Sequence, residues 1–334
     1  METSRIEALA AALTAEAEGR SGVVLVHHHD RAVLELATGL ANRADQRPMT
    51  VDTRLGTASG TKGFTALAAV SMIEEGRFGF DSRLVELVGD LPAVDPAVTV
   101  EHLLGHTSGV GDYLDEEVFD DPDDYVLDVP VHQLLGPEDF VPTLNQYPQV
   151  DPPGTRFAYN NGGYLWLALV IERLGDHDYH EEVRRRVFQP AAMAATEFLR
   201  SDLLPADAAL GYLSDGRTNV LHLPVIGTGD GGAYTTGPDM LRFWDAFLAG
   251  RIVGPDLVER LTAITHHEPP ESYGLGFWIG PDDNVFLEGM DAGVSLRSGV
   301  HRPSGLRYCL IANNSSDVWP LARIVQEHLD AGAD

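Results

Sequence analysis

The sequence contains very little lysine and cysteine. Only one of its 23 basic residues is a lysine, Lys62, and all the others are arginines. The single cysteine, Cys309, excludes a disulfide bond within the chain and lies in an apolar run, so we expect a core residue and not a nucleophile. An arginine keeps its proton at any working pH, whereas a desolvated lysine can act as a base. Lys62 is therefore the first residue to consider for chemistry.

Positive charge is scarce throughout the chain. The 334 residues carry 51 acidic and 23 basic side chains, and the formal net charge is −28. This balance argues against nucleic acids and anionic membrane surfaces as partners. The sequence also lacks an apolar run long enough to cross a bilayer, and it starts with an amphipathic stretch instead of an apolar signal core. We therefore expect a cytoplasmic protein.

Two further patterns are weak evidence for a bound metal or nucleotide. His27, His28 and His29 are adjacent, but neighbouring residues of a strand point to opposite faces, and no acid or cysteine has the spacing of a further ligand. We interpret them as the polar end of a β-hairpin, with a metal site as the less favoured alternative. The glycine-rich stretch 227–232 lacks the lysine and the helix of a phosphate loop. We expect no metal and no organic cofactor.

Hydrophobic periodicity predicts strands near both ends of the chain and helices between them. Helical spacing is found near the N-terminus and at 59–76, 100–104, 165–174, 238–248 and 318–329. Strand patterns are found at 21–26, 32–37, 273–279, 284–287, 294–300 and 306–312. The economical architecture is an α/β fold of the α+β type. In it, an antiparallel sheet is flanked by the terminal helices, and a mostly helical subdomain is inserted.

The same pattern predicts a division of the chain. Residues 1–57 and 230–334 would form the sheet subdomain and residues 58–229 the helical one, with the active site in the cleft between them. An acidic run from 115 to 128 falls in the helical part. We interpret this run as a solvated loop or helix face, with a rim that selects substrates as the alternative.

A serine, Ser59, precedes Lys62 by three residues at the start of an apolar helix. Residues i and i+3 lie on one face of a helix, so the Lys62 amine would reach the Ser59 hydroxyl. Ser59 itself would lie at the helix N-terminus, where free backbone N–H groups favour negative charge. We expect this helix to be buried, and burial lowers the pKa of a lysine. Taken alone, the spacing is a weak signal.

Further motifs strengthen this signal. The sequence Ser-Gly-Thr-Lys at 59–62 is followed about a hundred residues later by Tyr-Asn-Asn at 159–161. These motifs resemble Ser-x-x-Lys and Tyr-x-Asn of the serine β-lactamase and penicillin-binding-protein superfamily. The similarity is greatest to its class C-like branch, which includes D,D-peptidases, D-aminopeptidases and esterases. It extends over nearly the whole chain through short motifs at 106–109, 153–155 and 231–232.

The resemblance implies roles for the residues of both motifs. Ser59 would attack a carbonyl carbon and form an acyl-enzyme, while Lys62 would accept its proton or hold Tyr159 as the phenolate. Tyr159 would protonate the leaving group, and Asn161 would orient Lys62 or the substrate. The sequence leaves open whether Lys62 or Tyr159 is the base, and we expect the two to titrate as a unit. Backbone N–H groups, one of them from Ser59, would stabilise the oxyanion.

The third motif departs from the family's usual order of Lys or His, a small residue and Gly. We align it with Glu288, Gly289 and Met290, followed by Asp291, whose N–H would be the second oxyanion donor. In this alignment an acid replaces the group that helps to bind the carboxylate of a β-lactam, so such substrates would be repelled. We therefore expect a preference for neutral or cationic acyl substrates.

Together these residues predict a serine hydrolase that cleaves a small-molecule ester or amide through an acyl-serine intermediate. Esterase or peptidase-like activity is favoured over efficient β-lactamase activity. One alternative is a non-catalytic binding or scaffold protein, although such a protein need not keep a base beside a serine. Another is an acyltransferase that uses the same residues. The sequence gives no indication of an oligomeric state.

Overall fold

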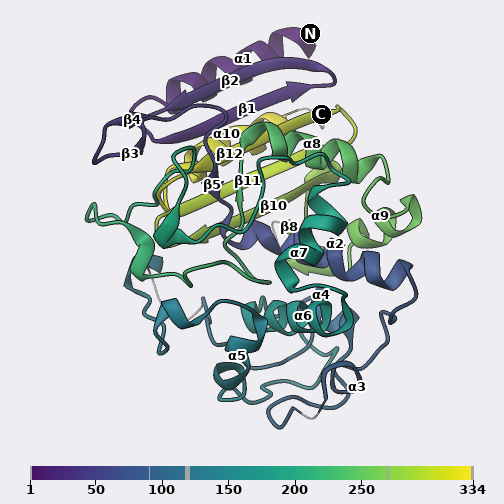
Figure 1. The fold of residues 1–334 in the computed structure, drawn as a ribbon. Coiled ribbons are helices and arrows are strands. Elements are labelled where there is room, and N and C mark those ends of the chain that lie inside the picture. The colour runs from purple at the N-terminus through teal and green to yellow at the C-terminus, as the bar shows by residue number, and fades with distance from the viewer. Residues whose placement is uncertain (1, 90, 117–120, 269–270, 332–334) are drawn as a thin grey trace.

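A large antiparallel sheet joins the two ends of the chain (Figure 1). The computed structural model describes residues 2–89, 91–116, 121–268 and 271–331. The strands of the sheet follow the order β2-β1-β12-β11-β10-β9-β8-β7. Their bounds are β1 (Gly22–His28), β2 (Arg31–Thr38), β7 (His266–Glu268), β8 (Glu271–Tyr273), β9 (Trp278–Gly280), β10 (Asn284–Asp291), β11 (Val294–His301) and β12 (Leu306–Ala312). Because β1 pairs with β12, the first and last parts of the chain fold together.

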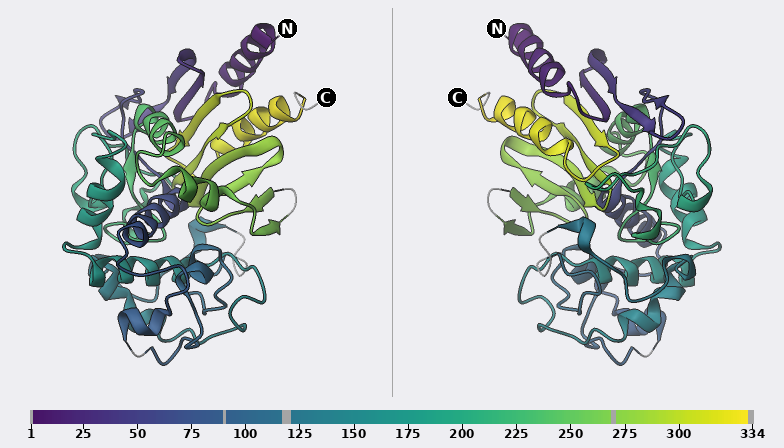
Figure 2. Two further views of the ribbon diagram at one scale, coloured as in Figure 1. Left: turned by 90° about the vertical axis from the view of Figure 1, so that its right-hand side faces the viewer. Right: turned by 90° about the vertical axis from the view of Figure 1, so that its left-hand side faces the viewer.

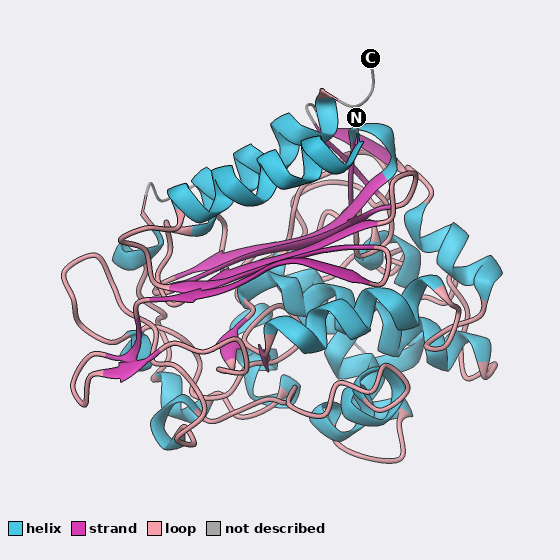
Figure 3. Cartoon of the chain, turned by 90° about the horizontal axis from the view of Figure 1, so that it is seen from above, coloured by secondary structure: helices cyan, strands magenta, loops and turns pink. Residues whose placement is uncertain are grey.

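The two faces of the sheet pack against different sets of helices. The terminal helices α1 (Glu2–Glu16) and α10 (Val318–Asp330) cover one face, as Figures 2 and 3 show. Successive side chains of a strand point to opposite faces. Val24 of β1 accordingly packs with the terminal helices, whereas Leu25 packs in the larger core on the other face. This arrangement confirms the predicted α+β fold with flanking terminal helices.

The larger core contains the central helices α2 (Thr61–Glu74), α6 (Asn161–Leu174) and α8 (Gly237–Leu248). Helix α2 is buried along most of its length, as its apolar composition predicts. The other helices are α3 (Leu84–Val88), α4 (Val100–Leu104), α5 (Pro137–Leu144), α7 (Tyr179–Val183) and α9 (Pro255–Thr262). Short strands form two further pairs, β3 (Leu40–Asn42) with β4 (Arg47–Pro48) and β5 (Leu55–Gly56) with β6 (Tyr234–Thr235).

The clearest differences from the predicted element boundaries are found in three places. Helix α6 begins at Asn161, four residues earlier than predicted, because the Asn160 side chain caps it by accepting a hydrogen bond from the Gly163 N–H at 2.6 Å. The strand predicted at 273–279 is divided into β8 and β9, with Gly276 in a left-handed conformation between them. Strand β10 continues to Asp291 because it pairs with β11 along its whole length. The division of the chain at 57/58 and 229/230 stays a prediction.

Several smaller predictions concern single residues. The three histidines lie at the end of the β1–β2 hairpin, as expected. Cys309 is fully buried in the larger core, and burial raises the pKa of its thiol to about 12. Among the described residues, no group of three or more His, Cys, Asp or Glu side chains is placed to hold a metal ion. In the same part of the chain, no helix has the length and apolar character needed to cross a membrane.

Candidate active site

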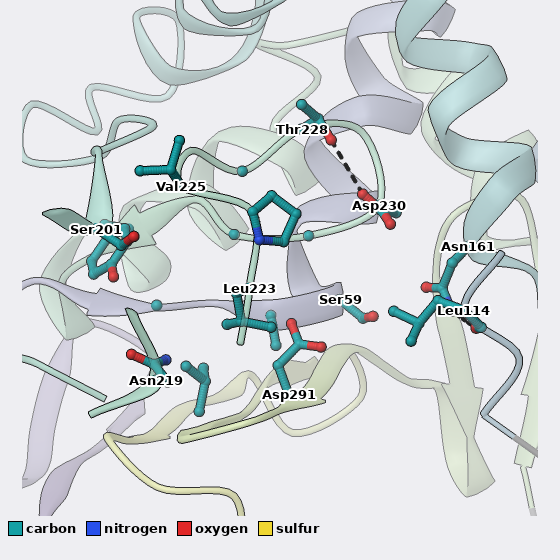
Figure 4. A pocket seen from close by; sticks show the side chains of 18 of the residues that line it. Ser59, Leu114, Asn161, Ser201, Asn219, Leu223, Val225, Thr228, Asp230 and Asp291 are labelled. Atoms are coloured by element: carbon teal, nitrogen blue, oxygen red, sulfur yellow. Dashed lines mark hydrogen bonds between the residues drawn. The ribbon is translucent and has the colours of Figure 1, made fainter. Parts of the chain in front are cut away.

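Ser59 lies in a single helical turn, η1 (Ala58–Gly60), that leads directly into α2. Ala58 has a φ of 45°, a left-handed conformation that is strained for a residue with a Cβ. Strain of this kind is concentrated at functional sites, where the surrounding structure holds it in place. The Ser59 side chain borders a pocket that Asn161, Asp230 and Asp291 also line (Figure 4).

The Lys62 amine is buried and makes three hydrogen bonds. It donates to Ser59 Oγ at 2.9 Å, to Asn161 Oδ1 at 2.7 Å and to the backbone carbonyl of Asp230 at 2.7 Å. These acceptors come from three separate parts of the chain, η1, α6 and the glycine-rich loop 227–232. The structure therefore brings Ser59, Lys62 and Asn161 into direct contact, at the spacing that helix geometry predicts for the first two.

Asn161 is oriented by the start of α6 and by the acidic run. Its Nδ2 donates to the backbone carbonyl of Leu114 at 2.7 Å and to Glu116 Oε1 at 3.1 Å. Its backbone N–H donates to Asp112 Oδ2 at 2.7 Å. With Nδ2 occupied in this way, the Oδ1 atom faces Lys62. The beginning of the acidic run thus contributes to the site.

Tyr159 lies beside Ser59 and Lys62 in a cluster of aromatic rings. Its ring centre is 4.9 Å from Lys62 Nζ, 4.4 Å from the His106 ring and 6.0 Å from the Trp278 ring. Burial is the largest influence on Tyr159 and raises its pKa well above the ordinary value, although a hydrogen bond with Ser59 lowers it. The neutral phenol is therefore the stable form of Tyr159.

The pKa of Lys62 is shifted in the opposite direction. Burial is the largest influence and lowers this pKa, because a charge is costly in a poorly solvated place. The negative charges of Asp230, Glu116, Asp291 and Asp112 oppose that effect. Burial therefore brings the pKa of the Lys62 amine closer to working pH, while the nearby carboxyl groups limit the shift.

The third motif approaches the serine through Gly289. A Cβ on Gly289 would lie 2.5 Å from the backbone nitrogen of Ser59 and 2.7 Å from the carbonyl oxygen of Thr57, so no side chain fits there. Met290, by contrast, is 41% exposed. On this geometry we propose a corrected alignment, in which Gly289 and not Met290 takes the position of the family's glycine. The motif then consists of Leu287, Glu288 and Gly289.

Glu288 is paired with an arginine. Its Oε2 lies 3.6 Å from Nε of Arg297, the residue directly opposite on β11, and Arg297 also donates a hydrogen bond to Glu271. Burial raises the pKa of Glu288 to about 7, and Arg297 lowers it. Since a cation balances Glu288, the expected repulsion of anionic substrates cannot rest on this residue alone.

The sequence did not predict that two acidic residues, Asp112 and Asp230, contact the site residues. Asp230 Oδ2 accepts a hydrogen bond from the Tyr113 hydroxyl at 2.6 Å, and the Asp230 backbone carbonyl holds Lys62. Asp112 accepts from the first backbone N–H groups of α6. The signal available for Asp230 was a single aspartate inside a glycine-rich loop, and Asp112 follows the motif at 106–109 closely. Neither pattern indicates by itself which distant residue it meets.

Comparisons of sequence agree with this geometry. A sequence model of the Beta-lactamase family matches residues 6–315. Penicillin-binding protein 4* of Bacillus subtilis is 28% identical over 213 residues, which cover 62% of this chain and 43% of that protein. The D-aminopeptidase of Brucella anthropi is 29% identical over 253 residues, 74% of this chain and 46% of that protein. The chain thus spans about half the length of these curated relatives.

Comparisons of structure agree as well. The penicillin binding protein from Bacillus halodurans superposes with a TM-score of 0.89 and 37% identity, covering 94% of this chain and 99% of that one. The D-amino acid amidase from Ochrobactrum anthropi SV3 shares the fold, with a TM-score of 0.81 and 20% identity over 99% of this chain and 98% of that one. From its motifs, its fold and these matches, the chain belongs to the Beta-lactamase family, within the superfamily of serine β-lactamases and penicillin-binding proteins.

Proposed function

We propose that the chain is a serine hydrolase that cleaves a small-molecule ester or amide through an acyl intermediate on Ser59. Membership of the family, with D-aminopeptidase, amidase and hydrolase relatives, supports hydrolase-type activity in general. The observation that carries the specific proposal is the buried Lys62 amine, which lies 2.9 Å from Ser59 Oγ and is held by two further acceptors.

Lys62 is the better base of the two candidates. Burial lowers the pKa of Lys62 and raises that of Tyr159, so a neutral amine is easier to form here than a phenolate. A neutral Lys62 keeps two N–H donors for Asn161 Oδ1 and the Asp230 carbonyl, and its lone pair then faces the Ser59 hydroxyl. In acylation the Ser59 proton passes to Lys62 while Oγ attacks the carbonyl carbon.

Tyr159 completes the proton transfers. Its hydroxyl protonates the leaving oxygen or nitrogen, and the Lys62 ammonium then returns a proton to the Tyr159 phenolate, whose ring centre lies 4.9 Å from Nζ. In deacylation, water attacks the acyl carbon and gives its proton to this pair, and Ser59 recovers its hydroxyl. The two residues share one proton through the cycle, so the pH dependence of the rate belongs to the pair.

The oxyanion would be held by the N–H of Ser59 and an N–H of β10. The corrected alignment assigns the second donor to Met290 instead of Asp291. Within the described chain, β9 pairs with β10 only at 284–286. The edge of β10 that faces β9 is therefore unpaired over residues 287–291 and open to a substrate. Gly289 packs on the serine turn without a side chain and thereby keeps this edge close to Ser59.

The proposed substrates are neutral or cationic. In the corrected alignment Leu287 takes the position of the family's Lys or His, and its side chain is buried against Gly63 of α2. Neither alignment thus provides the cation that would bind a β-lactam carboxylate, and carboxylates surround Lys62. This composition favours esters and amides over β-lactams.

Hydrolysis of p-nitrophenyl butyrate by the wild type and by Ser59→Ala tests the proposal. We expect the wild type to release p-nitrophenol in a saturable reaction and Ser59→Ala to lose at least about a thousandfold in kcat. Ser4→Ala, in the exposed first turn of α1, is the matched control and should behave as the wild type. Equal rates in the wild type and Ser59→Ala would refute the proposal. Failure of a fluorophosphonate probe to label Ser59 would favour a scaffold, and ester formation with added alcohol would favour an acyltransferase.

A further inference from the structure

Four carboxyl groups surround the Lys62 amine. Asp230, Glu116, Asp291 and Asp112 all act on Lys62 through their charge. The Lys62 amine makes its three hydrogen bonds to Ser59 Oγ, Asn161 Oδ1 and the Asp230 backbone carbonyl, and none of them to a carboxyl group. The partners of each carboxyl group therefore show which of them is left to bind something else.

Three of the four carboxyl groups have partners in the protein. Asp112 accepts from the first two backbone N–H groups of α6 at 2.7 and 3.0 Å. Glu116 accepts from Asn161 Nδ2 at 3.1 Å, and Asp230 accepts from the Tyr113 hydroxyl at 2.6 Å. Each of these groups has a structural task in the site, because it orients an element or a side chain that holds Lys62.

Asp291 is different. Within the described residues its carboxyl group has no hydrogen bond and no ion pair, and only burial and the charges of other groups act on it. Burial is the largest influence and raises its pKa to about 7. Figure 4 shows the carboxyl group beside Ser59, directed into the pocket. A half-buried carboxylate without a partner is costly, so a cation that enters the pocket gains an interaction that the protein does not already use.

The space around Asp291 suits a cation that carries an apolar substituent. A Cβ on Gly231 would come within 3.5 Å of Asp291 Oδ2, so the glycine keeps the space beside the carboxyl group open. Leu114 and Leu223 line the pocket that contains Ser59, and they also line a second, adjoining pocket. Asp291 borders both pockets and therefore lies where they meet.

We propose that the Asp291 carboxylate binds the ammonium group of an amine-bearing ester or amide and places its carbonyl carbon at Ser59. This inference rests on the proposed function for its catalytic meaning, but the binding itself does not require turnover. It assigns to the Asp291 side chain a task separate from the backbone N–H that the sequence alignment had given to this residue. An amine on the acyl group would enter with its apolar substituent against Leu114 and Leu223.

The test measures binding on the Ser59→Ala protein, so that turnover plays no part. Calorimetry at pH 7.5 compares leucinamide, as either enantiomer, with 4-methylpentanamide, which is the same molecule without the amine. We expect leucinamide to bind more tightly than 4-methylpentanamide. We also expect Asp291→Asn, in the same background, to reduce the ratio of the two affinities by about tenfold or more, since a hydrogen-bonded charge pair is lost. Asp176→Asn, which removes the same charge at an exposed site paired with Arg77, is the control and should leave the ratio unchanged.

Two outcomes would overturn the proposal. One is an equal affinity for the two amides in the Ser59→Ala protein. The other is that Asp291→Asn keeps its melting temperature and changes the ratio of the two affinities by less than twofold. Loss of the preference in Glu116→Gln instead would assign the ammonium group to Glu116. In the enzyme that keeps Ser59, Asp291→Asn should lower the ratio of kcat/KM for leucine p-nitroanilide to kcat/KM for 4-methylpentanoyl p-nitroanilide to the same extent. A binding preference without hydrolysis of either anilide or of p-nitrophenyl butyrate would refute the proposed function and leave the cation site standing.

Discussion

Adding one methyl group at Gly289 should disrupt catalysis more than stability. In Gly289→Ala the new Cβ would lie 2.5 Å from Ser59 N, 2.7 Å from Thr57 O and 2.8 Å from Gly60 N, all of them backbone atoms. Ordinary contacts of this kind begin at 3.4 Å, so β10 and the serine turn must separate by about 1 Å. This movement would displace both the nucleophile and the edge that we assign to the oxyanion.

The expected magnitudes follow from that separation. A displacement of about 1 Å at reacting groups costs about a hundredfold in rate, so kcat/KM for p-nitrophenyl butyrate should fall by about that factor. Overpacking of a close backbone contact costs about 1–3 kcal/mol in the free energy of unfolding, which a chain of this size survives. The variant should therefore fold, with a melting temperature lower by a few degrees.

The assay for Gly289→Ala combines steady-state kinetics with a thermal melt. Gly136→Ala is the matched control, because its new Cβ would meet only Glu172 Oε2, at 4.0 Å, and its backbone is extended. We expect Gly136→Ala to retain wild-type activity. If Gly289→Ala keeps kcat/KM within threefold of the wild type and an unchanged melting temperature, β10 does not approach the serine at Gly289, and the corrected alignment is wrong.

Three further perturbations test separate parts of the site. Lys62→Arg keeps the charge but cannot release a proton, so kcat/KM should fall by about a thousandfold between pH 7 and 9, whereas an effect below tenfold would exclude Lys62 as the base. Tyr159→Phe removes the proton donor, and kcat should fall by about 10²–10⁴ with the fold retained by circular dichroism. A normal kcat would assign the leaving-group proton elsewhere. The pKa of Asp291 is raised in the folded state to about 7 from 3.8, so its contribution to stability is complete below about pH 4 and is lost as the pH rises through 7. Between pH 4 and pH 8, the free energy of unfolding measured with urea should therefore fall by about 1–4 kcal/mol less in Asp291→Asn than in the wild type. Parallel pH profiles for the two proteins would contradict this reasoning.

The parts of the site that were predictable from sequence are local. Ser59 and Lys62 meet because helix geometry fixes the position of residues three apart, and the buried α2 follows from its nearly continuous apolar sequence. Asn161 was assigned from the family motif, which carries the long-range contact that no local pattern shows. The sheet and its terminal helices were predictable because alternating and helical periodicity are strong at both ends of the chain.

The parts that were missed depend on register or on distant contacts. Strand side chains alternate with a period of two, so a slip of one residue in the third motif exchanges the pocket face for the opposite one. Gly289 and Met290 were both available as the family's glycine position, and only the contact with Ser59 N separates them. The unpaired carboxyl group of Asp291 likewise depends on where Lys62, Glu116 and Asp230 lie in space. No periodicity encodes that information.

The most direct test of the central claim is the mass of the protein during turnover. The wild type is mixed with p-nitrophenyl butyrate, quenched in acid within the first turnovers, and measured intact and after proteolysis. We predict a butyryl adduct on the peptide that contains Ser59, which decays as substrate is exhausted and is absent from Ser59→Ala. Turnover of the ester without any adduct on Ser59, or with an adduct on another residue, would contradict the account.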